Sequence, residues 1–91
     1  MNSYIVVARF KSEVTQDDVR EMIPAEQAQA KVLEDQGLLG SIKIAMPKRT
    51  VFLEVFANDD SHANSTIESL PMSMLWDWEI FETTPPAGAP S

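Results

Sequence analysis

Four short segments in which polar and apolar residues alternate, interleaved with two helical patterns, most strongly constrain what this chain can fold into. Successive side chains of a strand point to opposite faces, whereas a helix brings every third or fourth residue to one side. Capping and turn residues bound both kinds of segment. The expected strands span residues 3–10, 39–46, 50–57 and 75–82, and the expected helices run from a cap at Thr15 to Gln36 and from a cap at Asn58 or Asp59 to Ser69.

The order of these segments is β-α-β-β-α-β, which is the split β-α-β or ferredoxin-like arrangement. Ninety-one residues form one small domain. We therefore expect a single α+β domain over residues 1–82 and a Pro- and Ala-rich C-terminal tail over residues 83–91. Pro24 lies inside the first helical pattern, and the sequence leaves open whether it kinks that helix or divides it into two.

The two faces of the expected sheet differ in composition. One face is apolar apart from one phenol, so we assign it to the helices. The other, called here the mixed face, combines large apolar side chains with five charges. Its residues are Ile5, Val7, Arg9, Lys43, Ala45, Phe52, Glu54, Phe56, Asp77, Glu79 and Phe81. Solvated faces rarely carry so much apolar surface and sealed cores rarely carry so many charges. The mixture favours a face that closes against a second subunit, as in a dimeric α/β barrel with a partly polar cavity. A plain dimer interface with rim ion pairs is the alternative.

Glu26 interrupts the apolar stripe of the first helix. The stripe comprises Val19, Ile23, Glu26, Ala30 and Leu33. A carboxylate held against apolar surface has its charged form disfavoured, so its pKa rises toward the range useful for proton transfer. Two ordinary interpretations stay open at this point. Glu26 could lie at the edge of the stripe and reach water, or Pro24 could open a helix and place Glu26 near the positive end of its dipole.

Composition excludes several classes of function. The net charge is −7, from 14 acidic and 7 basic residues, so no basic patch is available for nucleic acid or an anionic membrane. The chain has no cysteine, and its single histidine, His62, excludes a site with two histidine ligands within one chain. No Gly-rich phosphate loop is present, and no apolar run is long enough for a signal peptide or a membrane span. We expect a cytoplasmic protein with no metal and no cofactor that acts on a small-molecule substrate.

Acid–base chemistry by carboxylates is the remaining class of catalysis. Glu26 is the candidate catalytic residue. The candidate substrate-binding residues lie on the mixed face and are Lys43, Arg9, Glu54, Phe52 and Asp77. Lys43 or Arg9 could hold an enolate oxygen or a substrate carboxylate, and Arg9 could do so with two hydrogen bonds. Each charged residue also has an ordinary interpretation as a surface charge or an ion pair.

Two segments of the chain resemble the muconolactone isomerase family. Residues 26–37, EQAQAKVLEDQG, are similar to a family helix that begins with glutamate and ends in a Gln/Glu-Gly pair. Residues 65–80, STIESLPMSMLWDWEI, are similar to the family's Leu-Pro element and last strand. The resemblance implies a dimeric α/β barrel, often assembled into larger rings. It also implies cofactor-independent transfer of a proton between two carbons of an unsaturated lactone, with Glu26 as general acid/base in the barrel cavity.

Three functions follow as hypotheses. The first is an isomerase of a small unsaturated lactone or related carbonyl compound, working as a homodimer or a higher homo-oligomer. The chain departs from the family pattern at Lys43, where the family has an arginine nearby, and at Asn64, where it has a histidine. The second hypothesis is therefore a cofactor-free monooxygenase or aromatic polyketide cyclase on the same barrel. The third is a binding or assembly module without catalysis.

Overall fold

The computed structural model describes residues 1–84, which form a four-stranded sheet and two α-helices. The elements in chain order are β1 (Asn2–Phe10), α1 (Gln16–Asp35), β2 (Leu39–Ala45), the 3-10 helix η1 (Met46–Lys48), β3 (Thr50–Ala57), α2 (Asp60–Glu68), the 3-10 helix η2 (Pro71–Leu75) and β4 (Trp76–Thr83). The four strands and two helices expected from the sequence are confirmed, with ends that differ by at most one residue. Most of the predicted tail, residues 85–91, lies outside the described residues.

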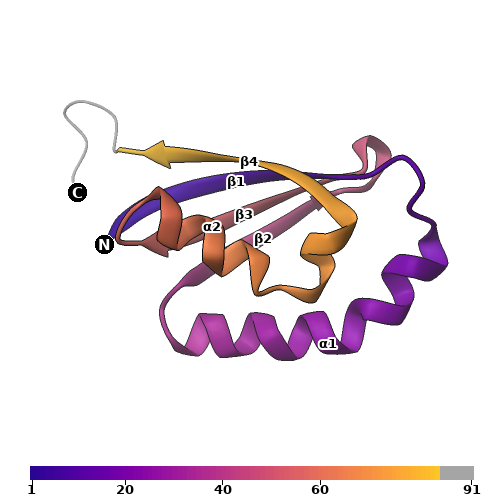
Figure 1. Ribbon diagram of the computed structural model, residues 1–91, viewed down its shortest axis with the longest axis horizontal. Coiled ribbons are helices and arrows are strands. Elements are labelled where there is room, and N and C mark those ends of the chain that lie inside the picture. Colours follow the sequence, from indigo (N-terminus) through magenta and orange to yellow (C-terminus); the bar gives the residue numbers. More distant parts are fainter. Residues whose placement is uncertain (85–91) are drawn as a thin grey trace.

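The strands pair antiparallel throughout, in the order β2-β3-β1-β4. Both helices cover one face of the sheet, and the opposite face is uncovered, as Figure 1 shows. An α+β domain with this element order and this sheet is compatible with the ferredoxin-like fold. The uncovered face, called here the open face, carries the residues that the sequence assigned to the mixed face.

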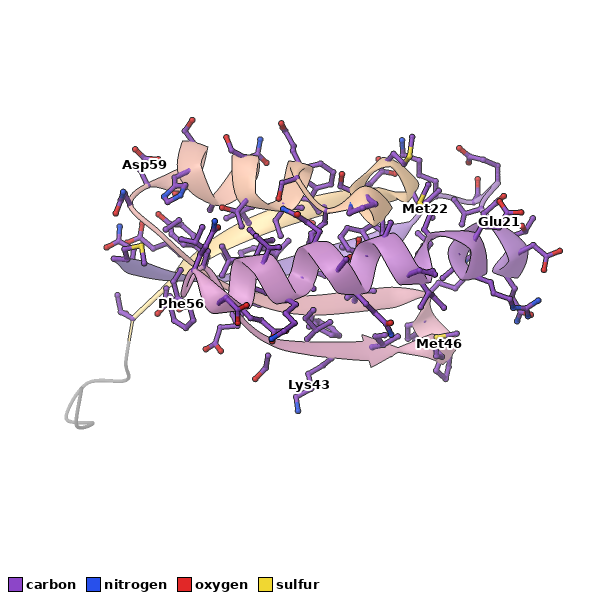
Figure 2. All side chains as sticks on the ribbon, turned by 90° about the horizontal axis from the view of Figure 1, so that it is seen from below. Glu21, Met22, Lys43, Met46, Phe56 and Asp59 are labelled. Atoms are coloured by element: carbon purple, nitrogen blue, oxygen red, sulfur yellow. The ribbon has the colours of Figure 1, made fainter. Side chains whose placement is uncertain are left out.

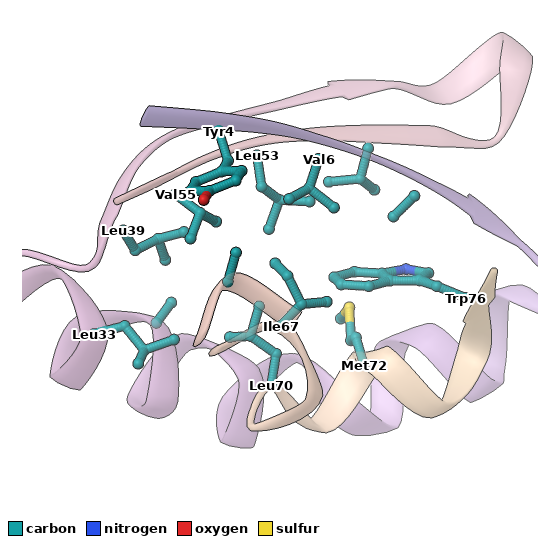
Figure 3. Packing of buried hydrophobic residues seen from close by; sticks show 14 of the residues in the cluster. Tyr4, Val6, Leu33, Leu39, Leu53, Val55, Ile67, Leu70, Met72 and Trp76 are labelled. Carbon is teal, nitrogen blue, oxygen red and sulfur yellow. The ribbon is translucent and has the colours of Figure 1, made fainter. Parts of the chain in front are cut away.

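The core fills the space between the helices and the covered face of the sheet. Figure 3 shows Tyr4, Val6 and Leu53 on the sheet side, opposite Ile67 and Leu70 on the helical side. All five side chains are at most 1% exposed. The covered face is therefore the apolar face predicted from the alternation of the strands, and its burial is the main source of stability in the domain.

Strand β2 departs from the expected burial. Ile42 and Ile44 alternate with Lys43 and so belong to the apolar face assigned to the helices, yet they are 37% and 61% exposed. In the view of Figure 2, β2 with Lys43 and Met46 extends beyond the edge of α1. Since β2 is an edge strand and only β3 flanks it, its apolar residues lie partly outside the shelter of the helical layer.

Helix α1 is continuous through Pro24. It begins with a capping box, in which the Thr15 side chain accepts from the Asp18 N–H and the Asp18 carboxylate accepts from the Thr15 N–H. It ends before Gly37, which has a φ of +75° and the left-handed conformation typical of a residue that follows a helix. Pro24 removes one backbone donor, but packing against the sheet holds both halves as one element. Among residues 1–84, no helix is both long enough and apolar enough to cross a membrane.

The stripe of α1 that faces the core differs from the expected one at a single position. Ile23 was expected on the stripe, but it is 39% exposed, and Met22 packs against the core in its place. Ala30 and Leu33 are buried as expected. Glu26 lies between Met22 and Ala30 on this stripe and is half-buried.

Candidate functional site

Glu26 lies in the middle of α1, where this helix packs against η2. Its Oε1 accepts a hydrogen bond from the backbone N–H of Met72, with an N–O distance of 2.9 Å. Pro71 begins η2 and has no N–H to donate, so Met72 presents the first free backbone donor of that short helix. The Glu26 carboxylate therefore caps η2 and is held in one position by it.

The surroundings of Glu26 disfavour its charge. Burial raises its pKa above the ordinary value of 4.5, and the hydrogen bond from Met72 acts in the opposite direction with a smaller effect. The ion pairs among residues 1–84 do not include Glu26, so no cation in this part of the chain offsets its desolvation. Glu26 is therefore a partly desolvated carboxylate, and its partial exposure also agrees with the interpretation that it lies at the edge of the stripe and reaches water. The interpretation with Pro24 at a helix start is wrong, because α1 begins at Gln16.

The candidate substrate-binding residues lie on the other side of the sheet. Along β1 and β3, every second residue is buried under the helices, and the residues between them face outward. Arg9, Lys43, Phe52, Glu54 and Asp77 all belong to the open face. Because the sheet separates this face from α1, the structure does not bring Glu26 together with any of them within one chain. The predicted pairing of Glu26 with Lys43 or Arg9 at one oxyanion is therefore not assembled in a single subunit.

Three charged residues of the open face already have partners. The Arg9 and Glu79 side chains approach to 3.6 Å and are 59% and 65% exposed, so this ion pair contributes little to stability. The Oε1 of Glu54 accepts from the Ser41 N–H at 3.4 Å. The Glu54 carboxylate also lies against Gly40, at the bulge of β2, where a Cβ would collide with it. Glu54 thus packs over the irregular part of the β2–β3 ladder.

Glu26 does not line either of two wide, shallow hollows on the surface of residues 1–84. One lies beside the β2 bulge and is lined by Glu34, Leu39, Gly40, Ser41, Ile42 and Glu54. The other lies between α2 and β4 and is lined by Asp60, Ser61, Asn64, Trp78 and Ile80. Within residues 1–84, no three side chains of types that bind metals lie close enough together to hold an ion.

Two polar groups in the core escaped the sequence-based prediction. The Tyr4 hydroxyl and the Trp76 Nε1 are buried, and neither makes a hydrogen bond of 3.5 Å or shorter within residues 1–84, although the side chains of Asn2 and Asp60 lie near the Tyr4 hydroxyl. Burial raises the pKa of Tyr4 above its usual 10.0. Both side chains belong to the layer between sheet and helices, the same layer as Glu26. Alternation marks both residues as core, but it says nothing of whether their polar atoms find partners.

Two polar residues of α2, His62 and Asn64, make hydrogen bonds with structural roles. His62 is partly exposed, and its Nδ1 accepts from the Asn58 N–H at 3.0 Å. This hydrogen bond closes the first turn of α2, which Asp59 caps. The Trp78 Nε1–H donates to the Asn64 Oδ1 at 2.9 Å and ties β4 to α2.

A scan against protein-family models finds no match for this chain, and a search of curated proteins finds no relative. The resemblance to the muconolactone isomerases therefore stays a prediction. The fold class and the surroundings of Glu26 are what bear on function.

Proposed function

We propose that the protein is a cofactor-independent isomerase that moves a proton within a small unsaturated lactone or a related carbonyl compound, with Glu26 as general acid/base. The observation that carries this proposal is the half-buried carboxylate of Glu26, which one backbone hydrogen bond holds in place and which no cation neutralises within the described chain. A carboxylate with a raised pKa is the better base, because general acid–base catalysis is most efficient when the pKa lies near the working pH.

The two oxygens of Glu26 have different roles in this proposal. Oε1 is occupied by the Met72 N–H, whereas Oε2 has no hydrogen-bond partner among residues 1–84. Oε2 takes a proton from the carbon beside the substrate carbonyl, and the electron pair of that C–H bond moves toward the carbonyl oxygen as an enolate forms. The same oxygen returns the proton two carbons away, so the double bond shifts and neither an oxidant nor a reductant is consumed.

The neighbours of Glu26 suit an apolar substrate ring. Met22 and Ala30 lie one turn before and one turn after it on the same stripe of α1. Methionine side chains adapt readily to the shape of a bound group. The five-residue helix η2 contacts the carboxylate through the Met72 N–H and would form one wall of the substrate site beside Oε2.

We further propose that the active form is a homodimer in which two open faces pack together as a dimeric α/β barrel, with larger rings built from such dimers. Three large apolar side chains of this face, Ile5, Phe52 and Phe81, are 36%, 40% and 48% exposed. Contiguous apolar surface of this kind marks an interaction site in a soluble protein. A 91-residue domain also gains from the extra burial.

The test is the conversion of a panel of five-membered unsaturated lactones, with and without a carboxymethyl arm, followed in D₂O by proton NMR. We expect the wild type to shift the double bond and to exchange the proton beside the carbonyl with solvent. Glu26→Gln should lower the rate by about a hundredfold or more, the usual contribution of a general acid/base. Glu21→Gln, a charge change at an exposed position of the same helix, is the matched control and should remain active.

Retention of activity by a folded Glu26→Gln variant would contradict the mechanism. Absence of turnover and of solvent exchange for every lactone of the panel would instead favour a binding or assembly module without catalysis. One observation already supports this second candidate. The hydrogen bond from Met72 gives Glu26 a structural role that requires no substrate.

A further inference from the structure

The charge of this chain is divided unevenly between its two halves. Residues 1–49 contain all seven lysines and arginines together with seven acids, whereas residues 50–91 contain seven acids and neither lysine nor arginine. The whole net charge of −7 therefore belongs to the second half. Because α2, η2 and β4 all come from this half, the edge of the domain where α2 packs beside β4 has carboxylates but no lysine or arginine of its own.

A hollow on this edge brings together polar groups and an aromatic ring. It lies between α2 and β4, has a volume of about 410 Å³ and is lined by Asp60, Ser61, Asn64, Trp78 and Ile80. Asp60 and Asn64 lie one turn apart on α2, with Cβ atoms about 5–6 Å from each other, so one bound group can contact both side chains. The hydrogen bond from Trp78 Nε1 to Asn64 Oδ1, at 2.9 Å, fixes the indole ring beside them.

A buried donor lies close to one residue of this hollow. The Tyr4 ring is fully buried on the helical side of the sheet, as Figure 3 shows, and its hydroxyl makes no hydrogen bond of 3.5 Å or shorter within residues 1–84. The Asp60 side chain lies near this hydroxyl and also lines the hollow. Burial raises the pKa of Tyr4, and the carboxylates of Glu82 and Asp60 raise it further, so the hydroxyl keeps its proton. A rotation of the exposed Asp60 side chain would let one carboxylate oxygen accept from Tyr4 while the other faces the hollow.

We propose that this hollow binds a primary ammonium group at the end of a short hydrocarbon chain. The ammonium N–H groups donate to the Asp60 carboxylate and to Asn64 Oδ1, and the hydrocarbon chain packs on Trp78 and Ile80. The Tyr4 hydroxyl donates to the second oxygen of Asp60 and positions that carboxylate.

The charges and donors of the hollow favour this ligand chemistry. No ion pair among residues 1–84 includes Asp60 or Glu82, so a cation at the hollow meets no competing base from α2 or β4. Aromatic rings attract cations to their faces, and an ammonium group with three donors matches carboxylate and amide oxygens. An anion would be repelled by the same carboxylates.

Ordinary structural roles account for some of these acids but not for their combination with the other groups. Acids on an edge strand discourage pairing with another chain, which explains Asp77 and Glu79 on β4. An acid in the first turn stabilises a helix, which suits Asp60 at the start of α2. Neither role needs the Trp78 ring beside Asp60 or the Tyr4 hydroxyl near it. Glu26 takes no part in this site, so the ammonium site and the proposed isomerase can fail separately.

The test is a titration with n-pentylammonium chloride at constant ionic strength, followed through the indole N–H signals in ¹⁵N NMR. The chain has two tryptophans, and Trp78→Phe identifies the two signals. We expect the Trp78 signal to shift with half-saturation at about 1 mM, an affinity that a ligand of this size can reach. The Trp76 signal should stay in place, because this ring is buried in the core. 1-Pentanol has a chain of the same length without the charge, and it should bind at least about tenfold more weakly.

Three substitutions separate binding from folding. Asp60→Asn preserves the size of the side chain and removes its charge, and it should weaken pentylammonium binding about fivefold, the upper range for an exposed ion pair. Asp17→Asn removes an acid from the first turn of α1, and as the matched control it should bind as the wild type does. Tyr4→Phe should weaken binding about threefold. Its midpoint of thermal unfolding should stay the same or rise, because the substitution removes a buried hydroxyl that lacks a partner.

Several outcomes would overturn the site. A Trp78 signal that does not move up to about 20 mM pentylammonium, or that moves equally with 1-pentanol, would exclude an ammonium ligand in this hollow. This comparison uses the wild type alone, so it decides the question even where a variant fails to fold. Equal affinity of the wild type and a folded Asp60→Asn variant would exclude Asp60 as the acceptor. Unchanged binding by Tyr4→Phe would exclude the hydroxyl from the site.

Discussion

Replacement of Glu26 distinguishes the effect of its charge from the effect of its hydrogen bond. The carboxylate gives the Met72 N–H an acceptor, but burial disfavours its ionised form. Glu26→Gln keeps a side-chain oxygen that can accept from Met72 and removes the charge. Glu26→Ala removes both the oxygen and the charge, and it leaves the first donor of η2 without this partner.

The expected magnitudes follow from these contacts. Loss of an acceptor for a part-buried N–H costs about 1–2 kcal/mol, because water replaces the hydrogen bond only in part. We therefore expect Glu26→Ala to lower the free energy of unfolding by about this amount at pH 7. For a domain of this size that corresponds to a decrease of roughly 4–16 °C in the midpoint of thermal unfolding. Glu26→Gln should be at least as stable as the wild type at pH 7, since it has no charge to desolvate.

The pH dependence has a definite sign. The pKa of Glu26 is higher in the folded chain than the unfolded value of 4.5, so the folded state binds the proton more tightly. The wild type therefore loses stability relative to Glu26→Gln as the pH rises from below 4.5 through the folded pKa, and the difference stays constant above it. Urea titrations from pH 3.5 to pH 8 measure this difference. A Gln variant as unstable as the Ala variant at pH 7 would refute the reasoning, because it would show that the charge stabilises the fold.

Two further comparisons of variants test the packing. Leu53→Ala removes a side chain that is 1% exposed, and it should lower the free energy of unfolding in urea by about 3 kcal/mol. Ile44→Ala on the exposed edge strand should change this free energy by less than about 0.5 kcal/mol. Equal effects of the two substitutions would contradict the assigned core. Gly40→Ala should displace the Glu54 carboxylate and lower the free energy of unfolding by about 1 kcal/mol or less. The same substitution made in the Glu54→Ala variant should lower it measurably less. Such a deviation from additivity shows that the two residues are coupled.

The strands, the helices and the faces of the sheet were predictable because alternation and helical spacing act locally along the chain. These local patterns also implied that Glu26 is separated from Lys43 and Arg9. The same alternation that placed the helices over one face of the sheet put both bases on the opposite face. A site that combined all three residues within one chain was inconsistent with that assignment.

Other features depend on tertiary structure and carry no local signal. Helical spacing of three or four residues fits Met22 and Ile23 equally well, and packing against the sheet selects Met22. The exposure of Ile44 follows from the edge position of β2, which only the strand order fixes. The hydrogen bond between Glu26 and Met72 joins residues 46 positions apart and depends on how η2 docks on α1.

The most direct test of the central claim is the titration of the Glu26 carboxyl carbon by NMR, with the resonance assigned from its absence in Glu26→Gln. A midpoint well above 4.5 is expected from burial of this side chain without a neutralising cation in the described chain. A midpoint at or below 4.5 would show that water or an unseen positive charge reaches the carboxylate, and it would contradict the assignment of Glu26 as the group that transfers the proton.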